Sequence, residues 1–139
     1  MRFTKSAAIA ATAGLALSLL GSAPAAAASN WSASAPKYAK NVSTRIQANT
    51  NLGTLQLRKG KYGSASYVWA RISSPSSTAN KNYDLQLYVG NWSYTSVDIN
   101  GTSYTDGYRL ISGETYKGCL RKKTNIPGGG FYKCVSFKA

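Results

Sequence analysis

The chain has 139 residues, with 17 lysine and arginine residues against four acidic residues and no histidine. The formal net charge of +13 favours anionic partners, and the missing histidine excludes Ser-His, Cys-His and metal-His sites. Two cysteines without histidine cannot complete a zinc site, so we expect no metal and no cofactor.

Residues 1–28 have the composition of a secretory signal peptide. Arg2 and Lys5 precede an uncharged apolar stretch over residues 7–20, and small residues follow up to Ala28. The apolar stretch is too short to span a bilayer comfortably. We therefore expect cleavage after Ala28 and a secreted, extracellular protein. The 111 residues after position 28 carry 15 cations and four acids, a net charge of +11, and suffice for one domain.

The segment 29–41 predicts a flexible N-terminal arm. It consists mostly of small and polar residues with one proline, yet it contains the aromatic residues Trp31 and Tyr38. An exposed aromatic side chain on such an arm binds either its own domain or a partner. We favour its own domain and keep both residues as binding candidates.

Residues 42–139 predict a single β domain. Apolar and polar residues alternate over short runs such as TLQLRKG (54–60) and DLQLYVG (84–90), and clusters of Gly, Asn, Ser and Pro separate these runs. No segment shows a helical apolar stripe. We expect an all-β fold, a small antiparallel sandwich or barrel of seven to eight short strands with one disulfide.

Two local patterns predict strand pairing and strand faces. Asn100 and Gly101 are typical of a type I′ hairpin turn, which would pair residues 96–99 with residues 102–105. Strict alternation in the last strand would place four residues on one face: Phe131, Lys133, Val135 and Phe137.

Cys119 and Cys134 are expected to form the disulfide, because an exported chain meets an oxidising compartment. Closing a loop of about 16 residues contributes about 3 kcal/mol in the chain-entropy model. The loop carries three successive cations: Arg121, Lys122 and Lys123. A loop held at both ends could bind an anionic partner, or its cations could serve solubility and block edge-to-edge aggregation. Both interpretations stay open.

The four acidic residues do not indicate a catalytic pair. Asp98 lies near the Asn100 turn and Asp106 precedes Gly107, so both are interpreted as turn residues. A glycosidase needs two carboxylates held several ångströms apart. We expect no enzymatic activity.

The segment SYVWARIS (66–73) is a candidate binding strand. If its alternate apolar residues face the core, a row remains on the other face: Tyr67, Trp69 and Arg71. Such a row could stack on a sugar ring, bind an anion or form the centre of a protein interface. In the alternative, which we favour, both faces are covered, Trp69 is a core residue and Arg71 packs on an aromatic ring.

Basic and aromatic neighbours such as Lys61 and Tyr62 also suggest nucleic-acid binding. Neighbours on a strand point to opposite faces, however, so these pairs cannot form one patch. We therefore do not expect nucleic acid as a partner.

A V/L-x-L-R strand joined by a turn to a W-A-R strand occurs in the segment GTLQLRKGKYGSASYVWARI (53–72). The residues that carry this pattern are Leu55, Leu57, Arg58, Trp69, Ala70 and Arg71. In this segment the chain resembles a family of small actinobacterial secreted domains of unassigned function. The resemblance implies a compact secreted β domain without known catalysis. In overall form alone, the chain also resembles the small adaptor subunit of the secreted umbrella-shaped toxin particles of actinobacteria, which joins a toxin-bearing stalk to a lectin-like subunit.

The expected function is that of a secreted non-catalytic binding module, first of all a protein–protein adaptor or a subunit of an extracellular complex, including a toxin complex. One alternative is a cationic antimicrobial protein, or one that binds the cell wall, a membrane surface or another anionic polymer. A protease inhibitor is a further alternative, although the loop NIPGGG (125–130) is rich in glycine. The candidate binding residues are Trp31, Tyr38, Tyr67, Trp69, Arg71, Arg121, Lys122 and Lys123.

Overall fold

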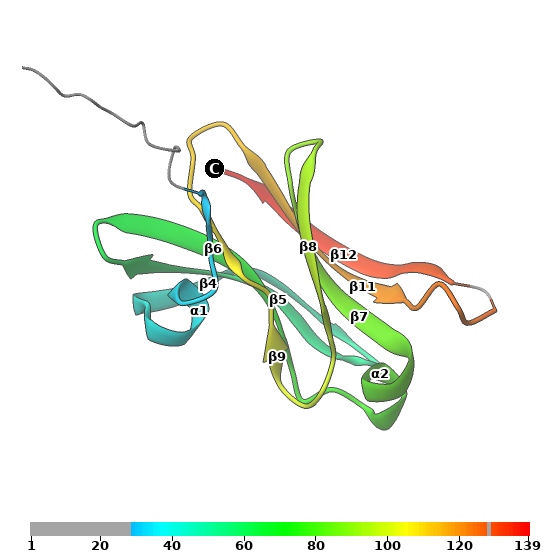
Figure 1. The fold of residues 1–139 in the computed structure, drawn as a ribbon. Helices are drawn as coiled ribbons and strands as arrows, with labels where there is room; N and C mark the ends of the chain where they lie inside the picture. The colour runs from blue at the N-terminus through cyan, green and yellow to red at the C-terminus, as the bar shows by residue number, and fades with distance from the viewer. Residues whose placement is uncertain (1–28, 128) are drawn as a thin grey trace, which may run out of the picture.

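The computed structural model describes residues 29–127 and 129–139. The expected signal peptide, residues 1–28, lies outside the described residues. In the described part, ten strands form two antiparallel sheets that lie face to face (Figure 1). The predicted all-β fold is confirmed, and its form is a sandwich.

The first sheet has the strand order β3–β10–β6–β5–β4, and β9 also pairs with β6. The bounds of these strands are Trp31–Ser32 for β3, Lys40–Thr50 for β4, Gly53–Tyr62 for β5, Ala65–Ser73 for β6, Ser103–Tyr104 for β9 and Gly107–Arg109 for β10. The sequence predicts fewer strands than the structure contains. Strands of two or three residues, such as β3, β9 and β10, are too short to show a period of two.

The second sheet has the strand order β12–β11–β7–β8. Its strands are β7 (Tyr83–Val89), β8 (Ser93–Asp98), β11 (Thr115–Lys122) and β12 (Gly130–Lys138). Two short helices, α1 (Ala35–Tyr38) and α2 (Ser77–Asn82), complete the described elements. Neither is long and apolar enough to cross a bilayer, and this holds for every helix of the described residues.

The core lies between the two sheets and is built from the apolar residues that alternate along the strands. Fully buried members from β5, β6, β7 and β11 are Leu55, Leu57, Val68, Ala70, Ile72, Leu85, Leu87 and Leu120. Gly118 of β11 allows the sheets to approach closely, because a Cβ atom there would lie 3.0 Å from Cδ2 of Leu57 in the opposite sheet. The period-two pattern of the sequence therefore identifies the core face of β5, β6 and β7 correctly.

The predicted hairpin at Asn100–Gly101 is wrong. The strand before it, β8, pairs with β7, and the strand after it, β9, pairs with β6, so this segment crosses from one sheet to the other. Of the two turn residues only Gly101 has a positive φ, 68°, whereas a type I′ turn needs two. The side chain of Asn80 in α2 accepts a hydrogen bond from the Gly101 backbone N–H at 2.8 Å, and Ile99 is buried. These tertiary contacts override the local turn preference.

The predicted face of the last strand is also only partly right. The register between β11 and β12 shifts at Leu120 and Arg121, so that Lys133 pairs with Leu120 and Phe131 pairs with Arg121. Tyr132 is the extra residue of this β-bulge. A bulge reverses the alternation beyond it, and Phe131 therefore lies on the face opposite to Val135.

The segment 29–41, expected to be a flexible arm, is packed against the domain. β3 pairs with β10, and the ring of Trp31 meets the ring of Tyr108 edge to face at 4.7 Å between centroids. Ala35 of α1 is fully buried. Short elements in a polar segment have no sequence period, so the arm was indistinguishable from a disordered tail.

The predicted disulfide between Cys119 and Cys134 is confirmed. The two cysteines lie directly opposite each other on β11 and β12. The bond therefore joins the middles of two neighbouring strands of one sheet and braces the β11–β12 pair.

Candidate binding surface

The outer face of the second sheet gathers aromatic and basic side chains from four strands. Tyr88 of β7 lies between Tyr94 of β8 and Lys117 of β11 in the register. Arg121 of β11 and Phe131 of β12 are register partners, and both lie on the same face. We call these five residues the outer aromatic patch.

The rings of the patch contact one another and remain accessible. Tyr88 and Tyr94 stack with 5.4 Å between ring centroids, and Tyr88 meets Phe131 edge to face at 5.8 Å. Tyr94 is 60% exposed and Phe131 is 50% exposed. Exposed large rings of this kind suit contact with another molecule, because each brings a broad apolar surface at a low cost in conformational entropy.

Two cations lie over these rings. The Lys117 Nζ atom is 5.4 Å from the ring centre of Tyr88 and 5.6 Å from that of Phe131. The Arg121 guanidinium is 5.0 Å from the ring centre of Phe131. The face of an aromatic ring attracts a cation but does not neutralise it. Within the described residues neither cation has a carboxylate at ion-pair distance, so the patch keeps its positive charge.

The β-bulge between Leu120 and Arg121 positions Phe131. Without the bulge, alternation would point Phe131 into the sandwich with Val135. With it, the rings of Phe131 and Tyr88 approach each other across the row that holds the cystine, and Cys119 is fully buried. The bulge therefore brings the Phe131 ring into the patch.

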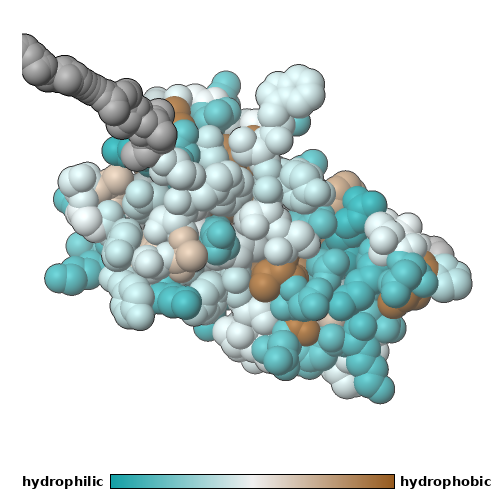
Figure 2. Space-filling model, in the orientation of Figure 1, coloured by the Kyte–Doolittle hydropathy of each residue, from teal (hydrophilic) through white to brown (hydrophobic). Residues whose placement is uncertain are grey.

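Trp92 extends the aromatic character of this end of the molecule. It lies in the turn between β7 and β8, two residues before Tyr94, and it is 92% exposed. A tryptophan that exposes nearly its whole side chain contributes nothing to the core. In the view of Figure 2, strongly hydrophobic residues form only small separate patches on a mostly hydrophilic surface. A partner bound at the outer aromatic patch would meet exposed rings and positive charges.

A small ionic cluster terminates the same sheet face. Asp84 of β7 and Asp98 of β8 are paired in the register, and Lys123 Nζ lies 3.8 Å and 3.3 Å from their respective Oδ1 atoms. Burial, and then the neighbouring Asp98 carboxyl, raise the pKa of Asp84. Hydrogen bonding with Asp84 and Lys123 lowers the pKa of Asp98. The interpretation of Asp98 as a turn residue is therefore wrong, because it ends a strand and joins an ion cluster.

The three cations of the predicted basic loop do not form one patch. Arg121 belongs to the outer aromatic patch, while Lys122 is half-buried between its register partners on β7 and β12. Lys123 is paired with two aspartates. Strand alternation separates the first two cations, so only Arg121 remains a binding candidate on this face.

The predicted row Tyr67, Trp69 and Arg71 is not an open surface. Trp69 is only 2% exposed, in agreement with the covered alternative, while Tyr67 and Arg71 are half-buried. Ala39 and Val42 cover Trp69, since a Cβ atom on Gly60 would meet both of them and the Trp69 ring within 3.1 Å. Among the described residues, Arg71 makes no cation–π contact, and its Nη1 donates a hydrogen bond to the Gln56 side-chain carbonyl at 2.8 Å.

The two aromatic residues of the expected arm have different surroundings. Trp31 packs against the core through Tyr108. Tyr38 is 67% exposed and borders a notch together with Lys40, Asn41, Lys61, Tyr62 and Gly63. This notch is a second, smaller place where rings and cations meet.

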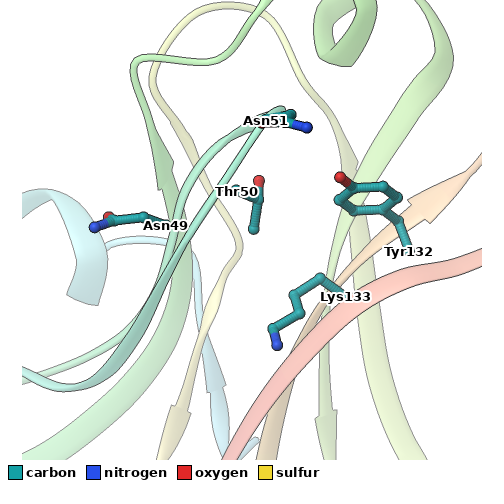
Figure 3. A pocket seen from close by; sticks show the side chains of 5 residues that line it. All are labelled: Asn49, Thr50, Asn51, Tyr132 and Lys133. Atoms are coloured by element: carbon teal, nitrogen blue, oxygen red, sulfur yellow. The ribbon is translucent and has the colours of Figure 1, made fainter.

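A polar cleft separates the turn after β4 from the start of β12. Figure 3 shows Tyr132 and Lys133 of β12 on one side of the cleft, and Asn49 and Thr50 at the end of β4 with Asn51 of the turn on the other. The cleft contains hydroxyl, amide and ammonium groups and no carboxylate or thiol. It can hydrogen-bond a ligand, but it offers no acid–base pair.

Sequence reasoning missed most of the outer aromatic patch: Tyr88, Tyr94, Lys117, Phe131 and the neighbouring Trp92. One signal was present, because the alternation of DLQLYVG places Tyr88 outward. The meeting of Tyr88 with residues 29 and 43 positions further along the chain depends on strand order and on the bulge, which no local pattern encodes.

Comparison with known proteins found no matching family model, no matching curated protein and no matching solved structure. Among the described residues, no three side chains of histidine, cysteine, aspartate or glutamate gather as metal ligands.

Proposed function

We propose that this chain is a secreted, non-catalytic binding module that holds an acidic face of an extracellular protein partner on its outer aromatic patch. The observation that supports this proposal is a set of exposed rings carrying Lys117 and Arg121 without a carboxylate partner in the described residues. Tyr, Trp, Phe and Arg are the side chains that most often anchor protein interfaces. An adaptor or a subunit of an extracellular complex would use such a face.

Charge complementarity favours an acidic partner. The chain after position 28 has 15 cations, and Lys123 is the one that forms an ion pair in the part of the chain that the structure describes. Acidic groups on a partner would therefore meet cations that are free to pair. The rings supply the contact area that distinguishes one partner from another.

A second function rests on the spread of these cations over many elements. A cell-wall polymer or an anionic membrane surface would bind through the sum of many weak charge contacts, without a particular role for the rings. In that case the alternative of an anionic-polymer-binding protein applies, and the outer aromatic patch is dispensable.

Affinity capture from the culture supernatant of the producing organism separates the two functions. We expect a stoichiometric protein that stays bound at about 1 M sodium chloride, where the Debye length is about 3 Å. We expect Tyr94→Ala, which removes an exposed ring, to release it, and Lys81→Gln, which removes a charge on α2, to retain it. Parallel sedimentation with purified cell walls tests the polymer: binding that disappears with salt and is equal for both variants would contradict the protein adaptor.

A further inference from the structure

Two arginine side chains share the outer face of the first sheet, on the side of the sandwich opposite to the outer aromatic patch. Arg58 of β5 is paired with Trp69, and Arg71 of β6 is paired with Gln56. Arg58 and Arg71 are therefore diagonal neighbours on one face, a separation that long side chains span readily. Both residues belong to the L-R and W-A-R motifs of the sequence.

The hydrogen-bond partners of both guanidinium groups are neutral. Arg58 Nη1 donates to Thr44 Oγ1 at 2.9 Å, and Arg71 Nη1 donates to Gln56 Oε1 at 2.8 Å. Gln56 in turn donates to Gln47 Oε1 at 2.9 Å. Among the described residues, no carboxylate lies at ion-pair distance from either arginine.

One donor of this arrangement has no partner. The Arg58 Nε atom is buried and makes no hydrogen bond with any described residue. Burial, and then the positive charge of Arg71, lower the pKa of Arg58. Two partly desolvated cations side by side are unfavourable, because each loses hydration and repels the other.

A purely structural role does not account for these groups. A guanidinium group has five N–H donors, and a structural network usually pairs buried donors and neutralises buried charge. Among the described residues, each guanidinium group has one side-chain hydrogen-bond acceptor, and that acceptor is uncharged. An oxyanion beside both guanidinium groups would accept hydrogen bonds from their free N–H donors and offset the repulsion between the two positive charges.

We propose that Arg58 and Arg71 form an oxyanion-binding site that takes a carboxylate, phosphate or sulfate group. The planar fork of guanidinium binds two oxygen atoms of such a group at once, and two forks from neighbouring strands can bind it from two sides. Trp69, the register partner of Arg58, is buried on the same face beside the two arginines. The site is independent of the partner proposed for the outer aromatic patch.

Titration of the ¹⁵N-labelled protein with sodium sulfate, and separately with sodium acetate, tests the site. Sodium chloride is adjusted so that the ionic strength stays constant, and the Nε–Hε resonance of Arg58 is followed. We expect a saturable shift with at least one anion, and an affinity weaker by at least about tenfold in Arg71→Gln. Lys81→Gln, which removes one charge at a distance, is the matched control and should bind within about twofold of the wild type.

A shift that never saturates, or an equal affinity in Arg71→Gln, overturns the proposal. Arg71→Lys, which keeps the charge and loses the fork, serves as a second variant, and the amide spectrum of each variant reports whether it is folded. Tighter binding of sulfate would support a phosphate- or sulfate-bearing polymer as the natural source. Tighter binding of acetate would support an acidic side chain or a uronic acid, and both outcomes support the site.

Discussion

At Tyr116 a single hydroxyl group bonds two backbone groups, one at the end of β10 and one in the loop between β10 and β11. The hydroxyl donates to the carbonyl of Arg109 at 2.6 Å and accepts from the N–H of Ile111 at 2.9 Å. The side chain is fully buried, its ring stacks on Phe137, and burial raises the pKa of the phenol. One side chain thus joins the core to a loop that lacks a regular strand.

Tyr116→Phe removes the hydroxyl and keeps the ring. Two backbone groups lose a partner, so we expect the free energy of unfolding to fall by about 1–3 kcal/mol. Urea denaturation followed by circular dichroism measures the change. Tyr94→Phe, at an exposed ring, is the control and should change it by less than about 0.5 kcal/mol. Equal losses in the two variants would contradict the role of the Tyr116 hydroxyl.

Asp84→Asn tests the ionic cluster with Lys123. The raised pKa of Asp84 means that its ionised form opposes folding, an effect absent below its unfolded pKa and complete above its folded pKa. We therefore expect the variant to gain stability relative to the wild type as pH rises from about 3 to 7. The difference between urea midpoints at the two pH values measures this gain.

The lowered pKa of Asp98 acts in the other direction. The contribution of Asp98 to stability is present above its unfolded pKa and is lost as pH falls through its folded pKa. The Asp84→Asn variant keeps Asp98. Asp106→Asn, at an exposed site without an ion pair in the described residues, is the control. A variant that loses stability toward pH 7 would show that the attraction of Lys123 outweighs the burial of Asp84.

At the scale of elements, α1 and the start of β4 act as a cover for the first sheet. Ala35 of α1 packs against Gly107, where an added Cβ atom would lie 3.2 Å from the Ala35 Cβ atom. Ala39 packs over Gly60 in the same way. The two glycines leave room for this cover, which buries Trp69 on the face opposite to the core. The polar segment that looked like an arm thereby becomes part of the folded domain.

Gly60→Ala tests the cover. The new methyl group would lie 2.8 Å from the Ala39 Cβ atom and 3.1 Å from the Trp69 ring, so the cover must move away. We expect a loss of about 1–3 kcal/mol in the free energy of unfolding and faster hydrogen exchange of the Trp69 indole N–H. NMR resolves this indole signal from those of Trp31 and Trp92.

The control for this variant is Gly63→Asn. Gly63 has a φ of 64° and open space around its Cα atom, and asparagine tolerates such a backbone. Its indole exchange should equal that of the wild type. Unchanged exchange in Gly60→Ala would mean that the cover does not protect Trp69.

The charge of +11 after position 28 dominates the behaviour of the whole molecule. Lys123 is the cation that forms ion pairs in the part of the chain described, so most positive charges repel one another without local compensation. Such repulsion raises the free energy of the compact state. It also leaves charge available for an anionic partner.

Salt should therefore stabilise this protein. We expect the free energy of unfolding to rise as sodium chloride increases from about 0.01 M to about 0.3 M, because the Debye length falls from about 30 Å to below 8 Å. Thermal unfolding at several concentrations measures this trend. Glycerol, which changes the solvent without screening charge, is the control series. A fall in stability with salt would show that attractive ion pairs outweigh the net repulsion.

The sequence alone was enough to predict the class of fold and its core. Alternation along residues 54–60 and 84–90 places Leu55, Leu57, Leu85 and Leu87 inside, and the structure buries all four. The disulfide followed from two cysteines in a chain with an expected export signal. These features are local or nearly so, because the side chains of a strand alternate whatever lies beside it.

Tertiary structure decided the site. The rings of Tyr88 and Phe131 meet only because β7 and β12 both flank β11 and because a bulge turns Phe131 outward. Strand pairing also explains the Asn100–Gly101 segment: β8 pairs with β7 and β9 pairs with β6, so the segment crosses between the sheets and does not form the predicted hairpin. Alternation specifies which face a residue takes within one strand, whereas strand order and register bring distant residues together, and these depend on the packing of the whole sandwich.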